Sequence, residues 1–571
     1  MRLHPSLEVL EIILTLPYAK MVPIPASRPS SGSSAGHTED IPAALLSELL
    51  VKLEEGLYPN AFAQLSSLLS AGSYSAVPSP TRVSPHQIIA LAATLSVHPR
   101  LTTRARDVET MKNADSALDF LRAVTKDYGV RAGGLGQSLA FVSASGERTA
   151  RGQRQRGGRR GVIKPSEMSE HSAKDGFKLR NRYADKDSIW NNAEDFWHVL
   201  GWAFNCSILH QTRWKRYFLL LEWMLNALSS DLEYNAKHGT ADQSIFAKYL
   251  SSVGEGRNNK RRVMRAILAD GGTRSTGEFP GIWKNETKPP KRKAEDEVAQ
   301  MDKKKKLDLE AGEFGDYYNN SDSDLESPAA GSLPRSRSAT TLLSVKGSRN
   351  ASGDEQRSQS TAGVSSTLAS FGGLDSLDLR RQTLALLVRL SQLSPAIFLD
   401  TEDLFDLFTE FLRPLPLPVF QRLVFTGSSP FPKDENTTRG LGVNEQSSLD
   451  QMLLRPLLAS AAPAYHDDCL TQADFETHFA PFAANTHSAT DNAKVSLLLE
   501  DLLLLLWRSE NLEWGEDLQT VVERGIEARR EKVAFDGRRK KSQRAKEDEE
   551  AVAMMENCGE RMLVVLELVK T

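Results

Sequence analysis

The chain has 571 residues, of which 40% are hydrophobic, and its formal net charge at pH 7 is −3. Long polar tracts limit the part that can fold to roughly 400 residues. The balanced charge argues neither for nor against nucleic acid, because local blocks of opposite sign cancel. Cys206, Cys469 and Cys558 lie far apart in apolar patterns, which excludes a disulfide framework and predicts buried, reduced thiols.

The first 40 residues are predicted to be a short helix followed by a disordered linker. Residues 3–16 have a helical apolar period, but Glu8 and Glu11 interrupt it and no small-residue cleavage site follows. We therefore expect an amphipathic helix there and no signal peptide. The Pro/Ser/Gly-rich residues 23–35 cannot pack and are predicted to be linker.

Residues 41–147 predict an N-terminal helical block. Two leucine-rich stripes, at residues 45–53 and 62–69, are separated by a Tyr-Pro pair. They predict two antiparallel helices. Two further helices are expected at residues 86–97 and 114–127.

Residues 148–186 are predicted to be a flexible, Arg/Gly-rich linker. The stretch RGQRQRGGRRG at residues 151–161 offers no core residue. Such tracts bind RNA or DNA phosphates non-specifically, and a soluble linker with no specific contacts is the equally weighted alternative. The candidate nucleic-acid contacts here are Arg151, Arg154, Arg156, Arg159 and Arg160.

Residues 187–285 are a Trp-rich helical region, in which residues 190–223 hold five of the eight tryptophans. Asn191 and Glu194 form a variant of the capping box and predict a helix start, and Thr212 predicts the start of a second helix. The apolar stripes leave almost no polar face on the second helix, which predicts burial nearly all round. An aromatic cage or a base-stacking platform is the alternative. The predicted core side chains are Phe196, Trp197, Trp202, Phe204, Trp214, Phe218 and Trp223.

A metal site is not predicted in this region. His198, Cys206 and His210 do not have the spacing of a zinc site, and nothing nearby supplies a fourth ligand. The sequence predicts no metal and no cofactor elsewhere.

Residues 258–269 predict a basic helix that ends at Gly271 in a glycine cap. One face is apolar and the other carries Lys260, Arg261, Arg262 and Arg265. Solvated charge is the simpler interpretation of the basic face, and a phosphate-contacting or acid-binding surface is the alternative. Phe279, Ile282 and Trp283 then predict an apolar anchor.

Residues 286–376 are low in complexity and predicted to be disordered. Two basic clusters separated by nine residues follow a Pro-Pro pair, and they match a bipartite nuclear import signal. Simple solvation of a charge run is the alternative. The residues concerned are Lys291, Arg292, Lys293, Lys303, Lys304, Lys305 and Lys306.

Downstream serines match short kinase motifs. Acids follow two of them at the third position, a proline follows another, and two arginines precede a fourth. Phosphorylation in such a tract would add charge without breaking a fold. The candidate phosphosites are Ser321, Ser323, Ser327 and Ser338.

Residues 377–571 predict a C-terminal helical region in which Pro395 and Pro414 end two helices. The run at residues 497–507 is apolar but includes two acids and is too short to span a bilayer, so no membrane association is expected. The basic residues 524–546 favour a solvated helix or linker, and a nucleic-acid contact is the alternative. The last helix has an apolar seam and should dock, with partner binding as its alternative use.

No catalytic motif can be defended. Neither glycine-rich stretch fits a P-loop, and a dinucleotide fingerprint needs a preceding strand, for which the sequence gives no convincing signal. One acidic cluster is interpreted as the solvent-exposed side of a helix whose phenylalanines point inward. Its members are Glu402, Asp403, Asp406 and Glu410.

The sequence therefore predicts an all-α fold: an irregular helical repeat (solenoid-like) or a multi-helix bundle, with long disordered insertions. The expected function is that of a non-enzymatic nuclear scaffold or adaptor that binds protein partners through helical surfaces, with basic segments giving weak RNA or DNA affinity. The alternative is an RNA-associated factor in RNA or ribosome maturation. No small-molecule substrate is expected.

Overall fold

A computed structural model describes most of the regions that were predicted to be helical. All described residues belong to one compact unit, which joins residues 1–288 with residues 360–571. The described residues are 38–74, 81–105, 107–132, 134–141, 179–288, 367–425, 441–458, 460, 462, 470–534 and 545–570.

The first group of helices matches the predicted N-terminal block. A proline ends α4, because the residue before a proline is driven to an extended conformation, as His98 is before Pro99. Helix α3 packs mainly against α5, and less closely against α2. The helices are α2 (Ala43–Glu54), α3 (Tyr58–Tyr74), α4 (His86–Val97), η1 (Pro99–Leu101), α5 (Val108–Ala132) and α6 (Leu135–Ser138).

Two short strands correct the expectation that the chain has none. Strands β1 (Thr38–Asp40) and β2 (Thr81–Val83) pair in parallel, with Thr38 opposite Thr81. Each has three residues, which is too short for the alternating pattern that reveals a strand in a sequence. The pair joins the chain before α2 to the chain before α4.

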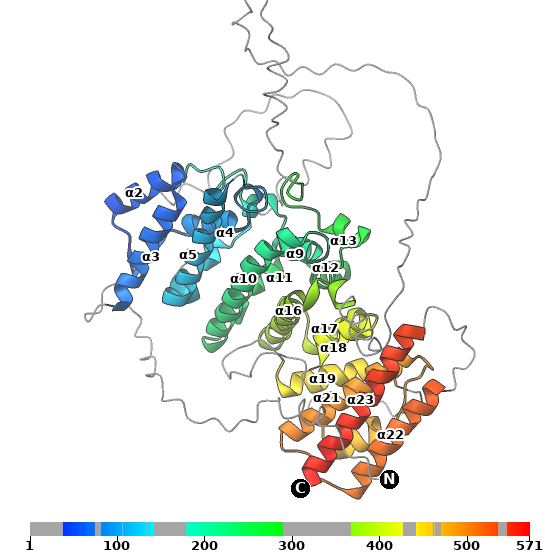
Figure 1. The fold of residues 1–571 in the computed structure, drawn as a ribbon. Coiled ribbons are helices and arrows are strands. Elements are labelled where there is room, and N and C mark those ends of the chain that lie inside the picture. Colours follow the sequence, from blue (N-terminus) through cyan, green and yellow to red (C-terminus); the bar gives the residue numbers. More distant parts are fainter. Residues whose placement is uncertain are drawn as a thin grey trace, which may run out of the picture. The chain divides into compact units, whose positions relative to one another are not determined.

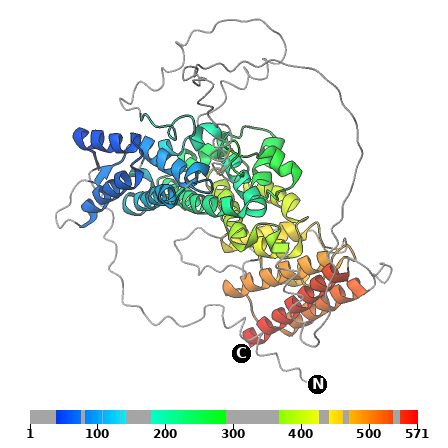
Figure 2. The same ribbon diagram turned by 45° about the horizontal axis from the view of Figure 1, so that its top comes forward.

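The central helices are built around α9 and α10, which pack against each other. In Figures 1 and 2, α10 lies beside both α9 and α16. The elements are α8 (Ile189–Asn192), α9 (Phe196–Leu209), α10 (Gln211–Lys237), η3 (Ala241–Gln243), α11 (Ile245–Ser251), α12 (Arg257–Ile267) and α13 (Thr273–Glu278).

The C-terminal helices end at the predicted prolines. Helix α16 stops at Leu393 before Pro395, and α17 stops at Leu412 before Pro414. The last helix docks along α21, as its apolar seam predicted. The elements are α16 (Gly373–Leu393), η4 (Pro395–Ile397), α17 (Thr401–Leu412), α18 (Leu417–Val424), α19 (Val443–Leu454), α20 (Gln472–Asp474), η6 (Phe475–Phe479, a π-helical turn), α21 (Ala489–Arg508), α22 (Glu516–Ala534) and α23 (Ala545–Lys570).

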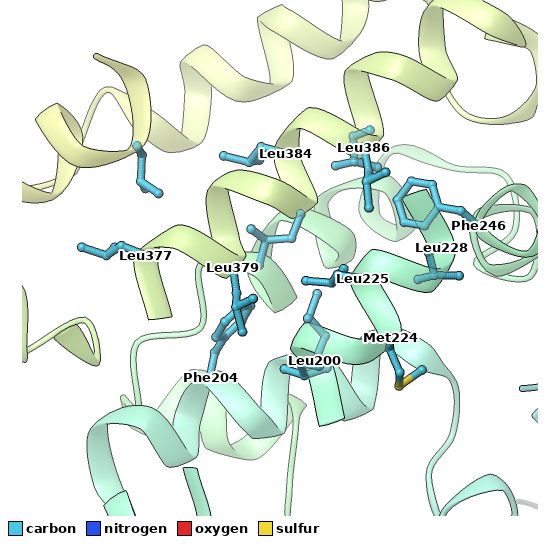
Figure 3. Close-up of a cluster of buried hydrophobic side chains, with 14 of the residues drawn as sticks. Leu200, Phe204, Met224, Leu225, Leu228, Phe246, Leu377, Leu379, Leu384 and Leu386 are labelled. Carbon is cyan, nitrogen blue, oxygen red and sulfur yellow. The ribbon is translucent and has the colours of Figure 1, made fainter. Parts of the chain in front are cut away.

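One hydrophobic core runs from Ile41 to Leu566 through all three predicted helical regions. Figure 3 shows where the central and C-terminal regions meet: leucines of α16, among them Leu379, lie next to side chains of α9 and α10, among them Phe204 and Leu225. A small second cluster surrounds Met555. The all-α prediction is confirmed, since most of the described residues lie in helices and their only strands are the two short ones.

The described structure extends beyond three predicted boundaries. Residues 179–186 were assigned to a flexible linker, yet Asn181 is buried and donates to the carbonyl of Leu53 at 2.7 Å. Residues 286–376 were assigned to disorder, yet residues 286–288 and 367–376 are described and Glu286 is buried. Polar composition misled the prediction at these edges, because each buried polar group has a partner far away in the chain.

Candidate functional site

Helix α9 begins at a different cap from the predicted one. The carboxylate of Asp195 accepts a hydrogen bond from the amide of His198 at 2.8 Å, which makes Asp195 the N-cap. Asn191 lies instead in the short α8, whose cap is Ser188. Helix α10 likewise begins at Gln211, one residue before the predicted cap Thr212.

The tryptophans of the Trp-rich region lie inside the molecule. Trp197 is fully buried, and Trp202, Trp214 and Trp223 are each at most 5% exposed; Phe218 is half-buried. Two indole N–H groups donate to distant backbone: Trp197 to the carbonyl of Tyr249 at 3.2 Å, and Trp223 to that of Leu121 at 3.0 Å. A cage or stacking platform needs accessible ring faces, and the burial of these rings leaves little room for either.

The carboxylate of Glu286 is the centre of the most connected buried polar cluster that the structure describes. Its Oε1 accepts from the indole of Trp202 at 3.0 Å, from Nε of Arg213 at 3.0 Å and from the hydroxyl of Tyr217 at 3.1 Å. Its Oε2 accepts from the amide of Trp283 at 2.9 Å. A charge buried among so many donors is electrostatically satisfied.

The anchor predicted at residues 279–283 is buried beside this cluster. Phe279 is completely buried and lies against Gly201 of α9, where an added Cβ would come within 2.4 Å of its ring. Trp283 packs edge-on against His98, with ring centroids 5.0 Å apart. Burial lowers the pKa of His98 to about 3, so its ring is neutral in the fold.

Four buried cations bind the carbonyl ends of helices other than their own, and we call them the end-capping cations. Arg213 donates to Val97 at the end of α4 at 2.8 Å, and Arg380 donates to Ile267 at the end of α12 at 2.7 Å. Positive charge at a helix C-terminus is favourable because unpaired carbonyls and the helix dipole converge there. The other two are Lys494, which donates to Arg413 and Leu415 beyond α17, and Arg529, which donates to Ala480 and Phe482 beyond η6.

The end-capping cations keep their charge at neutral pH. Burial lowers the pKa of Arg380 to about 9 and that of Lys494 to about 8. The guanidinium of Arg380 also lies 4.2 Å from the ring centroid of Phe204, a cation–π contact. Arg529 belongs to the basic run that was predicted to be solvated, and its burial corrects that expectation for this residue.

The basic face of α12 is largely engaged within the protein. Arg261 pairs with Glu410 of α17, Arg262 with Asp195, and Arg265 with Glu278 at 2.7 Å. These guanidinium groups are therefore already neutralised by carboxylates. Lys260 has no ion pair with any described residue. The helix ends at Ile267, earlier than the predicted end at Ala269.

The acidic face of α17 is exposed at Glu402, Asp403 and Asp406, and Phe405 and Phe408 of the same helix are buried. The described residues contain no group of three or more His, Cys, Asp or Glu side chains arranged to hold a metal ion. His198 is engaged otherwise, because its ring contacts the carbonyl of Pro280 at 2.8 Å. Cys206 and Cys558 are buried thiols whose pKa values are raised by burial.

The other predicted sites lie outside the described residues. They are the arginines at positions 151–160, the import-signal residues at 291–293 and 303–306, the candidate phosphosites Ser321, Ser323, Ser327 and Ser338, and Cys469. They stay predictions from the sequence.

A second buried polar cluster was missed by the sequence reasoning. Asp450 of α19 and Asp501 of α21 are at most 1% exposed, and Glu500 beside them pairs with Arg561 of α23 at 2.6 Å. The available signal was the pair of acids inside the apolar run of α21, since a charge in such a run needs a buried partner.

The chain matches no family model, and comparison with curated proteins finds no similar sequence. Among the described helices, none has both the length and the apolar character needed to cross a membrane.

Proposed function

We propose that this protein is a non-enzymatic scaffold or adaptor of a nuclear assembly, which binds protein partners through the surfaces of its helices. The end-capping cations carry this proposal. Each ties the carbonyl end of one helix to a side chain of another, so the helices have fixed relative positions. Binding surfaces that are preorganised in this way lose less entropy when a partner docks.

Nucleic-acid affinity has an auxiliary role in this proposal. An RNA-associated factor is the second candidate, and the Arg/Gly tract at residues 151–161 favours it. The ion pairs of Arg261, Arg262 and Arg265 weigh against the basic helix as its main contact. The proposal therefore assigns any nucleic-acid contact to the Arg/Gly tract.

Affinity purification of the tagged full chain from nuclear extract, followed by mass spectrometry, tests the scaffold proposal. We expect several protein partners in near-stoichiometric amounts that survive nuclease treatment. Partners that all disappear after nuclease treatment would instead favour the RNA-associated factor. Recovery of the bait alone, with no stoichiometric partner, would contradict both candidates.

Nuclear import is expected to depend on the two basic clusters. A fluorescent fusion of the full chain should be nuclear, and it should become mostly cytoplasmic when Lys291, Arg292, Lys293, Lys303, Lys304, Lys305 and Lys306 are changed to glutamine. Neutralising Arg538, Arg539, Lys540 and Lys541 removes a similar basic cluster elsewhere and is the matched control. A wild-type fusion that stays cytoplasmic, or a variant that stays nuclear, contradicts the import signal.

Changing Arg151, Arg154, Arg156, Arg159 and Arg160 to glutamine is expected to reduce the salt dependence of RNA binding. Each arginine that contacts a single-stranded phosphate contributes about 0.7 to the slope of log K against log salt, so five contribute about 3.5. The matched control changes the same residues to lysine, which keeps the charge and should keep the slope. An unchanged slope in the glutamine variant would exclude the tract as the contact.

A further inference from the structure

Helix α19 presents an unusual number of buried polar side chains. It packs against α17 and α21, and most of its second half is inaccessible to solvent. The polar members are Gln446, Ser447, Ser448, Asp450 and Gln451. Buried polar groups of this density have to be satisfied by one another, because no solvent reaches them.

The carboxyl group of Asp450 is only half satisfied by protein donors. Its Oδ1 accepts from Nε2 of Gln446 at 2.9 Å. Its Oδ2 has no donor among the described residues, and the carboxyl group of Asp450 lies within hydrogen-bonding reach of the carboxyl group of Asp501 on α21. Two ionised carboxylates cannot hydrogen-bond to each other, because both only accept.

One cation near this pair, Arg381, interacts with three acids. Arg381 lies on α16 and interacts electrostatically with both aspartates, and its own pKa is lowered by burial. Arg422 of α18 is occupied by Asp378 of α16, to which it donates two hydrogen bonds of 3.0 Å. On α21, Glu500 is paired with Arg561 of α23 and faces that helix.

We propose that Asp450 and Asp501 share one proton in the folded protein, which makes the contact between α19 and α21 a proton-dependent joint. The proton is bound to one carboxyl group and donated to the other, which fills the missing hydrogen bond on Oδ2 of Asp450. Its release to solvent leaves two adjacent negative charges in a dry site and pushes the helices apart. Because α19 also packs on α17, the joint connects α21 to the helices that precede α19.

The expected pH dependence follows from burial, which raises the pKa of Asp450 well above its ordinary range, with the Asp501 charge adding to the effect. Folding therefore takes up a proton at this pair wherever the unfolded aspartate is ionised. The stability that the pair contributes is complete below about pH 4 and is lost as pH rises through the raised pKa.

Asp450→Asn tests the shared proton, because the amide of asparagine can donate permanently to Asp501. We expect the melting temperatures of wild type and variant to be similar near pH 5 and to diverge as pH rises, with the variant about 2–4 °C higher by about pH 8. Asp501→Asn should have the same effect, because its amide can donate to Asp450. Asp406→Asn on the exposed face of α17 is the matched control and should follow wild type at every pH.

Measurements at the contact between α19 and α21 distinguish a change at this joint from a change in the stability of the whole protein. Hydrogen exchange in α19 and α21, corrected for its intrinsic pH dependence, should lose protection at high pH in wild type and keep it in Asp450→Asn. Infrared difference spectra with labelled aspartate should show a protonated carboxyl band in wild type that both variants lose. Parallel melting curves at all pH values, or the absence of that band, would overturn the proposal.

Discussion

Replacing Glu286 with alanine is expected to lower the free energy of unfolding by about 3–5 kcal/mol, measured by chemical denaturation. The loss is large because Arg213 would remain buried with its charge uncompensated. Tyr217 and Trp202 would also lose their acceptor.

A second variant separates charge from shape at this position, and a variant at another position is the control. Glu286→Gln keeps the size and part of the hydrogen bonding, so a smaller loss is expected that reports the charge alone. Glu255→Ala, at an exposed position before α12, should change stability by less than about 0.5 kcal/mol. If Glu286→Ala is no worse than Glu255→Ala, the cluster around Glu286 does not stabilise the fold.

Trp223→Ala is expected to unfold the central helices, with a loss of about 3–5 kcal/mol from the cavity and the lost apolar burial. Its ring is 4% exposed and its N–H binds Leu121 of α5, so it ties α10 to the N-terminal helices. Calorimetry of the full chain would show a lower melting temperature.

The half-buried Trp514, which lies against Lys570, provides the matched control. Trp514→Ala should cost clearly less than Trp223→Ala. A Trp223→Ala protein that keeps its melting temperature but loses a binding partner would show that this tryptophan is a contact residue and not a core residue.

Features that depend on neighbouring residues could be predicted from the sequence. Prolines end α16 and α17 for local reasons that need no knowledge of the fold. Ser394 leaves the helical conformation before Pro395, and Pro414 has no N–H group with which to continue α17. The stripes of α9 and α10 predicted helices that are covered on several sides, because apolar residues there recur at every angle around the helix. Neither observation required a partner distant in sequence.

Features that depend on distant partners could not be predicted. Glu286 looks like the first residue of a polar tract until Trp202, Arg213 and Tyr217 surround it. Arg529 is one of many basic residues in its segment, and only its contact with the carbonyls just beyond η6, almost fifty residues earlier, distinguishes it. Composition describes a residue's neighbours in the chain, whereas burial of a charge is decided by its neighbours in space.

Helix boundaries show a third kind of difficulty. Asn191 and Asp195 are both acceptable capping residues, and local chemistry alone does not rank them. Asp195 is the observed cap and also forms an ion pair with Arg262 of α12, a contact that no local pattern contains. The predicted cap was therefore wrong by a few residues, while the helix itself was predicted.

Both edges of the interval between residues 288 and 367 are held by α9. On one side Glu286 binds Trp202, and on the other Ser376 donates to Ser207 at 3.2 Å. Non-covalent contacts therefore hold the residues on both sides of the interval in place. The covalent connection through the interval adds little to this. Two separately expressed polypeptides, divided within this interval, should recognise each other and assemble. For the same reason, insertions or deletions within the interval should be tolerated, because they would leave the contacts on α9 intact.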